Sequence, residues 1–142
     1  MMPSEDDTPL IEFHYEDTDF ELPESNAVST WIQSVITTEK HQLRHLNYIF
    51  CSDEYLHQIN VEYLNHDTYT DIITFPFAES PLVESDIFIS VDRVRENAIS
   101  FNTTFESELR RVIIHGVLHL CGYRDKTEEE KKMMRKKEEE YI

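Results

Sequence analysis

Hydrophobic residues follow two spacings along this chain, and each spacing predicts one kind of element. Hydrophobic residues that alternate with polar ones, or that form short β-rich runs, predict strands, whereas hydrophobic residues three or four positions apart predict amphipathic helices. Strands are predicted at residues 10–15, 46–50, 71–77 and 86–91. Helices are predicted at residues 27–39, 53–64, 93–101, 105–121 and 127–141. The third and fourth strands are separated by Pro81 and a short polar loop, so we expect them to form a hairpin.

The chain is expected to fold as one α+β domain over residues 1–142, because it shows neither an internal repeat nor a linker. Its 142 residues are 39% hydrophobic, which is enough to build a core. Residues 1–8 are acidic and are expected to be disordered. They lack the basic and apolar regions of a signal peptide, and no apolar run is long enough to span a bilayer. These features predict a cytoplasmic protein with no membrane partner.

The charge balance is strongly acidic and bears on nucleic-acid binding. The chain has 29 acidic residues against 13 basic ones, which gives a formal net charge of −16. Because proteins that bind nucleic acids usually carry excess positive charge, any RNA-binding groove must be a local basic surface. The two cysteines, Cys51 and Cys121, are too few for a disulfide framework, and we expect them to pack in the core.

The only two glycines of the chain, Gly116 and Gly122, lie in the segment HGVLHLCGYRD. His115 and His119 are four residues apart, so both imidazoles lie on one helix face and can reach one metal ion. Gly122 permits the left-handed backbone that ends a helix and turns the chain back, which brings Asp125 toward the same point. Two imidazoles and a carboxylate suit catalytic Zn²⁺, and the same set can also hold Ni²⁺, Fe²⁺ or Mn²⁺. The sequence therefore predicts a metal site with three protein ligands.

A second histidine pair, His41 and His45, has the same spacing but neither a following glycine nor a third ligand. It lies in a polar stretch before a predicted strand and is expected to be solvated surface. Gly116 takes the position that the catalytic glutamate occupies in zinc proteases of the HExxH type, which disfavours peptide hydrolysis. A glycine inside a helix costs about 1 kcal/mol relative to alanine, which predicts a close approach by backbone or substrate. Glu108 is expected to be solvated rather than a partner of the site.

Three blocks of the sequence carry a resemblance to a known family. The first is His115-Gly116-x-Leu118-His119-Leu120-x-Gly122-Tyr123. The others are Leu64-Asn65 followed by Thr70-Asp71-Ile72-Ile73-Thr74-Phe75-Pro76, and Asp86-Ile87-x-Ile89-Ser90. In residues, order and spacing, these blocks resemble the YbeY family, the bacterial endoribonucleases of rRNA maturation.

The resemblance implies an α+β fold with a small mixed sheet of about four strands and a metal site on a central helix and the turn after it. It implies one Zn²⁺ ion per chain at His115, His119 and Asp125, with a zinc-bound water as nucleophile and no assigned catalytic side chain. The implied activity is that of a hydrolase that cleaves single-stranded RNA in 16S rRNA 3′ end processing and ribosome quality control. The implied partners are rRNA and the small ribosomal subunit or its assembly factors, and not DNA.

The chain departs from the family's pattern at the third ligand and at one basic residue. Asp125 stands where the family usually has histidine, but aspartate is a competent zinc ligand. The segment at residues 66–69 is shortened and lacks the basic residue that the family is thought to use on the phosphate. Arg93, Arg124 and Lys126 are therefore candidates for binding the substrate.

Two alternative functions remain open from the sequence. A metal-dependent peptidase is favoured by the HxxxHxxGxxD spacing and by the acidic charge, and is disfavoured by Gly116. A ribosome-assembly binding module with a structural zinc is favoured by the missing basic residue. Asp71 and Asp86 are expected at strand ends near the cleft, in structural rather than catalytic roles.

Overall fold

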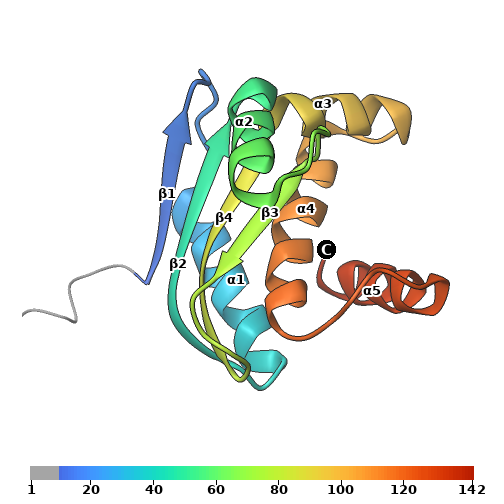
Figure 1. Ribbon diagram of the computed structural model, residues 1–142. Helices are drawn as coiled ribbons and strands as arrows, with labels where there is room; N and C mark the ends of the chain where they lie inside the picture. The colour runs from blue at the N-terminus through green and yellow to red at the C-terminus, as the bar shows by residue number, and fades with distance from the viewer. Residues whose placement is uncertain (1–9) are drawn as a thin grey trace, which may run out of the picture.

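The computed structural model describes residues 10–142, so the segment at residues 1–8 lies outside the described part. Four strands form one sheet in the order β1-β2-β4-β3. The strands β1 (Ile11–Glu16), β2 (Gln42–Cys51) and β4 (Leu82–Ser90) run parallel, and β3 (Ile72–Pro76) is antiparallel to β4 (Figure 1). The α+β class, the mixed four-stranded sheet and the hairpin between its last two strands are therefore confirmed.

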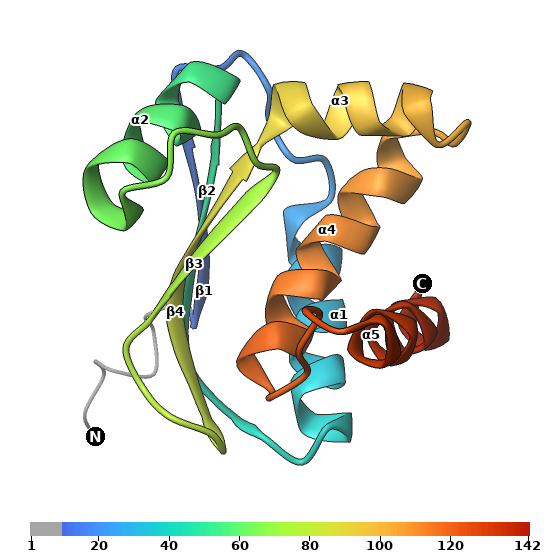
Figure 2. The ribbon, with the colours of Figure 1, turned by 45° about the vertical axis from the view of Figure 1, so that its right-hand side comes forward.

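Helices cover the two faces of the sheet unequally. They are α1 (Ser25–Thr38), α2 (Asp53–Leu64), α3 (Val91–Ser100), α4 (Phe105–Leu120) and α5 (Glu128–Tyr141). Figure 2 shows α1, α4 and α5 on one side of the sheet and α2 on the other. Every predicted helix is present, with its ends displaced by at most two residues. None of the helices within residues 10–142 is long and apolar enough to cross a membrane.

The core lies between the sheet and the pair α1 and α4. It is built from aromatic and branched aliphatic side chains that are fully buried, among them Ile32, Tyr48, Phe50, Ile87, Ile113 and Leu118. The Tyr48 hydroxyl donates a hydrogen bond to the backbone oxygen of Ile113 at 3.2 Å, which ties α4 to the middle of β2. Both cysteines are buried and unpaired, as predicted, and burial raises the pKa of each thiol to about 12.

Two strands begin four residues earlier than predicted, because backbone pairing extends them beyond their hydrophobic runs. β2 and β4 pair in parallel from Gln42 opposite Leu82 onward. Asp86 therefore lies in the middle of β4, opposite Phe75 of β3, and the prediction that it lies at a strand end is wrong.

The longer β2 also corrects the interpretation of the first histidine pair. His45 lies inside β2 and is half-buried, with its Nε2 atom 2.8 Å from Oε2 of Glu12 on β1. His41 precedes the strand and its Nε2 atom lies 2.8 Å from the hydroxyl of Ser80. The two rings thus contact different segments of the chain and are not freely solvated, contrary to the prediction.

Gly116 sets the separation of α4 and the sheet. A Cβ atom added at Gly116 would lie 2.9 Å from Cδ1 of Ile72 and 3.5 Å from Cγ2 of Ile87. A close approach therefore exists, but it is made by side chains of β3 and β4 and not, as the sequence predicted, by backbone or substrate. Ile72 is half-buried, so its terminal methyl group has room to turn aside.

Substituting Gly116 tests this packing. We expect Gly116→Ala to change the free energy of unfolding by less than about 1 kcal/mol, because the gain in helix propensity offsets the displacement of the Ile72 methyl group. Gly116→Val adds methyl groups that meet Ile87 as well, and is expected to destabilise by about 1–3 kcal/mol. Urea unfolding of the three proteins measures both values. A valine variant as stable as the parent would contradict the packing argument.

Candidate functional site

A hollow of about 240 Å³ lies between the start of β3 and the last two turns of α4. All three predicted ligands line it. Its lining residues are Thr70, Asp71, Ile72, Thr74, His115, Gly116, His119 and Asp125. Asp71 directly precedes β3, so the prediction that it lies at a strand end near the cleft is correct.

The turn after α4 brings Asp125 back to the helix. Gly122 has φ 104°, in the region that favours glycine, as predicted. The backbone N–H of Gly122 donates to the oxygen of His119, and that of Tyr123 donates to the oxygen of Leu118, both at 3.1 Å. This is the hydrogen-bond pattern of a Schellman motif. The chain reverses there, and a carboxylate oxygen of Asp125 comes within 3.3 Å of Nε2 of His115.

The geometry of the three candidate ligands is only partly that of a metal site. In tetrahedral Zn²⁺ sites with bonds of about 2.0–2.2 Å, two ligand atoms lie about 3.4 Å apart, which is close to the separation of His115 and Asp125. His119 is exposed and lines the same hollow. Within residues 10–142, however, no three His, Cys, Asp or Glu side chains are arranged to hold an ion as they stand. A three-ligand site would need His119 to turn inward, and the metal site stays a prediction.

The opposite edge of the His115 ring is held by an acid that the sequence analysis missed. Oε2 of Glu138, on α5, lies 2.6 Å from Nδ1 of His115. Burial lowers the pKa of His115, but the hydrogen bond and charge of Glu138, followed by the charges of Asp125 and Asp71, outweigh it, and the pKa is raised above its ordinary value. His115 is therefore oriented from both sides by carboxylates.

Glu138 belongs to a cluster of charged side chains that also includes two residues of α4. Arg111 contacts Oε1 of Glu138 at 3.3 Å and forms two hydrogen bonds to Glu108, at 3.0 and 2.6 Å. The two acids are each only 2% exposed. Glu108 is thus a buried partner of Arg111, and the prediction that it is solvated is wrong, because Arg111 one turn later supplies the compensating charge. The hydrogen bonds that Arg111 donates to Glu108, with the charges of Glu108 and Glu138, raise the pKa of Arg111 above its ordinary value although burial lowers it.

A helical spacing in α5 could have revealed Glu138. Met134 is buried, and Glu138 and Tyr141 follow it at i+4 and i+7, on the same face of the helix. Met133, the residue before Met134, is 48% exposed and lies off this face. The charged composition of this helix conceals a buried acid on its packing face.

Asp71 lines the hollow, and the burial of its charged carboxylate is unfavourable. Burial raises the pKa of its carboxyl group, and the charges of Arg111 and His115 reverse only part of that shift. Its Oδ2 atom accepts a long hydrogen bond, 3.4 Å, from the amide of Asn97. A carboxyl group in this position holds a proton more readily than an exposed aspartate does.

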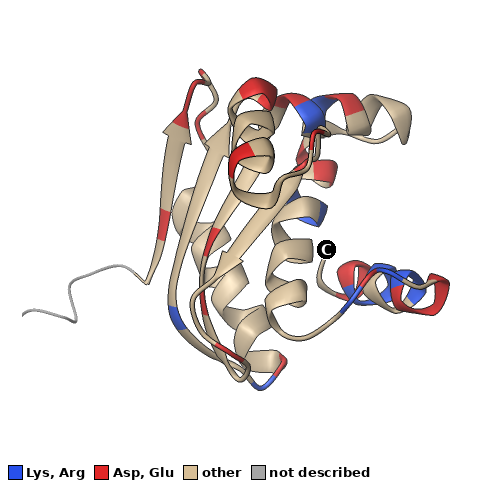
Figure 3. Ribbon diagram, viewed as in Figure 1, with Lys and Arg blue, Asp and Glu red and all other residues tan. Residues whose placement is uncertain are grey.

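The basic candidates lie outside the hollow. Arg93 is held by Asp53 at 2.7 Å and by Glu96 at 2.9 Å, so its charge is already compensated. Arg124 and Lys126 are exposed on the segment between α4 and α5, where Figure 3 shows Lys and Arg. The structure therefore places none of the three in the hollow, and only Arg124 and Lys126 adjoin one of its residues in sequence.

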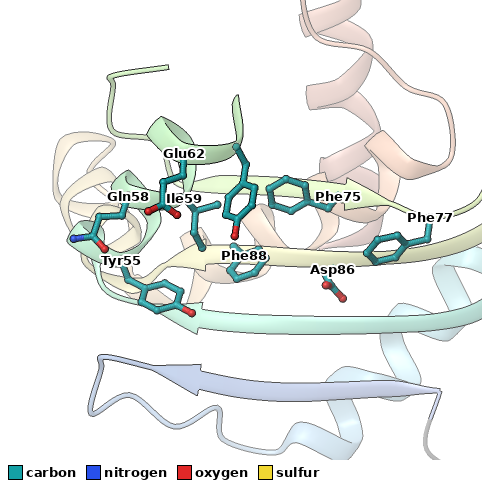
Figure 4. Close-up of a pocket in the computed structure, with 9 residues that line it drawn as sticks. Tyr55, Gln58, Ile59, Glu62, Phe75, Phe77, Asp86 and Phe88 are labelled. Carbon is teal, nitrogen blue, oxygen red and sulfur yellow. The ribbon is translucent and has the colours of Figure 1, made fainter. Parts of the chain in front are cut away.

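A second hollow, of about 420 Å³, lies against α2 and the other face of the sheet. Aromatic side chains from α2, β3 and β4 dominate it, with Asp86 at the sheet (Figure 4). Its full lining is Tyr55, Gln58, Ile59, Glu62, Tyr63, Phe75, Phe77, Asp86 and Phe88. None of the predicted metal or substrate-binding residues lines it.

Substituting Gly122 tests the turn. No atom lies within 4 Å of a Cβ added there, so any penalty comes from the backbone alone. We expect Gly122→Val to destabilise the fold by about 1–3 kcal/mol and to weaken zinc binding by displacing Asp125. Gly122→Asn tolerates positive φ better and is expected to have a smaller effect. Urea unfolding and zinc titration measure both effects, and a valine variant identical to the parent would disprove the role of the turn.

Substituting Asp71 tests the unfavourable burial. Because its pKa is raised on folding, the folded protein binds this proton more tightly, and stability falls as the pH rises from the ordinary value toward the raised one. In the presence of chelator, we expect Asp71→Asn to raise Tm at pH 7. The gain should vanish below about pH 3.9. Asp19→Asn, at an exposed position, is the control and should change Tm little. A lower Tm at pH 7 would contradict the prediction.

Comparisons with known proteins agree in pointing to one family. The family model described as "Endoribonuclease YbeY" matches residues 12–142. A Flavobacterium johnsoniae protein named "Endoribonuclease YbeY" is 53% identical over 119 residues, which cover 84% of this chain and 85% of the relative. A protein of the same name from Christiangramia forsetii is 52% identical over 128 residues, or 90% of each chain.

The fold is also similar to a solved structure. The solution structure of a Thermotoga maritima protein superposes with a TM-score of 0.63 at 30% sequence identity, covering 91% of this chain and 85% of that one. The sequence match spans nearly the whole described chain and includes the residues that line the hollow. The chain therefore belongs to the endoribonuclease YbeY family.

Proposed function

We propose that this chain is a zinc-dependent endoribonuclease that cleaves single-stranded RNA in the cytoplasm. Membership of the endoribonuclease YbeY family supports endonucleolytic hydrolysis of RNA. The single observation that carries the proposal is the hollow beside β3, which His115, His119 and Asp125 all line. We further propose that it acts in 16S rRNA 3′ end processing and ribosome quality control, with rRNA and the small ribosomal subunit or its assembly factors as partners.

The donor set of the hollow fits Zn²⁺ in its chemistry. Two imidazoles and one carboxylate form a three-ligand catalytic set that leaves a position open. His115 and Asp125 are already at a separation suited to shared coordination, and His119 completes the set by turning inward. A zinc ion bound there would act as a Lewis acid toward phosphoryl oxygen and lower the pKa of water.

The remaining residues of the site would orient His115, carry a proton and contact the phosphate. Glu138 holds the His115 ring from behind, so Nε2 faces the hollow. Asp71, with its raised pKa, can carry a proton at a carboxyl oxygen on the opposite wall. Arg124 and Lys126 adjoin Asp125 and are exposed, so they are the residues we propose for phosphate contact. Arg93 is a weaker candidate, since two acids already hold its guanidinium group.

The proposed activity is tested with purified protein on single-stranded and duplex RNA, with and without chelator. We expect cleavage of single-stranded RNA only, lost with chelator and restored by Zn²⁺. A peptidase assay in parallel addresses the metal-dependent peptidase, and rRNA binding without cleavage would favour the binding module with a structural zinc. Absence of RNA cleavage under every metal condition would overturn the proposal.

The ligand set is tested by metal content. We expect about one equivalent of zinc in the purified protein, and His119→Ala should lose most of it together with RNA cleavage. His41→Ala and His45→Ala are matched controls, since both rings contact residues outside the hollow, and they should keep zinc and activity. Unchanged zinc content in His119→Ala would exclude this residue as a ligand.

A further inference from the structure

Glu138 is a buried acid on the last helix, and it directly contacts His115 of the candidate metal site. It lies on α5, only 2% exposed, 23 residues after the histidine that it contacts. One carboxylate oxygen lies 2.6 Å from Nδ1 of His115, and the other lies 3.3 Å from the guanidinium group of Arg111. Both oxygens are thus engaged, each by a different residue of α4.

The hydrogen bonds to the buried acids in this cluster are not complete without the histidine. Glu108 and Glu138 are both buried, and Arg111 is the cation that contacts both. A buried carboxylate is expensive unless its oxygens accept hydrogen bonds. Glu108 takes the two shorter bonds from Arg111, so Glu138 depends on a hydrogen from Nδ1 of His115. The cluster is therefore satisfied only when that nitrogen is protonated.

We propose that Glu138 is a positioning residue that fixes the tautomer of His115. A carboxylate has no hydrogen to donate, and Glu138 is the nearer and more buried of the two acids beside the ring, at 2.6 Å against 3.3 Å for Asp125. In the neutral ring, the Nδ1 atom of His115 therefore carries the hydrogen and Nε2 keeps its lone pair. That lone pair faces the hollow, where Nε2 lies 3.3 Å from Asp125. A metal-ligating histidine is commonly held in this way through its other ring nitrogen. The role in metal binding rests on the proposed function, whereas the tautomer does not.

The helix that carries Glu138 and the turn that carries Asp125 are anchored on the same residue. Glu39, at the end of α1, accepts a hydrogen bond from the Tyr123 hydroxyl at 2.8 Å and lies 3.2 Å from Nζ of Lys137. The Tyr141 hydroxyl also donates to Glu39. Tyr123 is two residues before Asp125, and Lys137 is next to Glu138. The contacts with Glu39 therefore hold in place both segments whose carboxylates contact His115.

The test compares Glu138→Ala and Glu138→Gln with Glu139→Gln. Glu139 is exposed on the same helix, so its substitution removes the same charge without touching His115. Two quantities are measured: the tautomer of His115 by ¹H–¹⁵N correlation NMR of chelator-treated protein, at a pH where the ring is neutral, and the Zn²⁺ affinity by competition with a chromophoric chelator. Circular dichroism tests whether each variant is folded.

In the parent protein and in Glu139→Gln, we expect the hydrogen of His115 on Nδ1. Glu138→Ala should populate the Nε2–H tautomer and weaken Zn²⁺ binding by about 10–100-fold. Glu138→Gln keeps an acceptor oxygen and should retain the Nδ1–H tautomer, with a smaller loss of affinity. This partial rescue would not follow from a purely structural role.

Two results would overturn the proposal: an Nε2–H tautomer in the parent protein, or a folded Glu138→Ala variant with parental tautomer and affinity. If Glu138→Ala does not fold, the proposal is tested by the tautomer of His115 in the parent protein and by the tautomer and Zn²⁺ affinity of Glu138→Gln. If the parent binds no zinc, the proposed metal function fails separately, and the tautomer still tests the role of Glu138.

Discussion

The seating of α4 on the sheet is the constraint on which the rest of the structure depends. The buried face of this helix packs on β2 and β4, and Gly116 lets it approach β3 closely. Because side chains on a helix repeat every 3.6 residues, this packing also determines the helix face from which His115 and His119 project. The hollow between β3 and the helix is therefore a consequence of core packing. Its lining on α4 is set by that packing, while the turn that carries Asp125 depends on the backbone conformation of Gly122.

Several buried charged groups lie on the same helix or next to it. Glu108, Arg111 and Glu138 are charged groups at the boundary of the core, and Asp71 is an acid whose burial raises its pKa. Apolar residues of similar volume in such positions are often neutral or stabilising. The acids next to His115 are thus better explained by what they do to that ring than by stability. Buried acids with perturbed pKa values commonly cluster at functional sites.

The sequence predicted the elements and the location of the site, but not its inner partners. The spacing of His115 and His119 and the glycine at 122 are local features, and the helix and turn followed from them. Glu138 was missed because its burial depends on contact with α4, and its spacing from Met134 was the only local indication of a packing face in a highly charged helix. The early starts of β2 and β4 were missed for a related reason, since pairing between distant strands extends them.

Charge explains how so acidic a protein can act on RNA under the proposed function. Four carboxylates, those of Asp71, Glu108, Asp125 and Glu138, lie in or behind the hollow, with Arg111 among them. Without an ion, this arrangement repels phosphate, and with a net charge of −16 the wider surface does not compensate. A divalent cation at His115, His119 and Asp125 would offset two of these negative charges and would place positive charge at the lining of the hollow. Under the proposed function, metal binding and RNA binding would then be coupled, because the ion would also reduce the repulsion between the hollow and a phosphate.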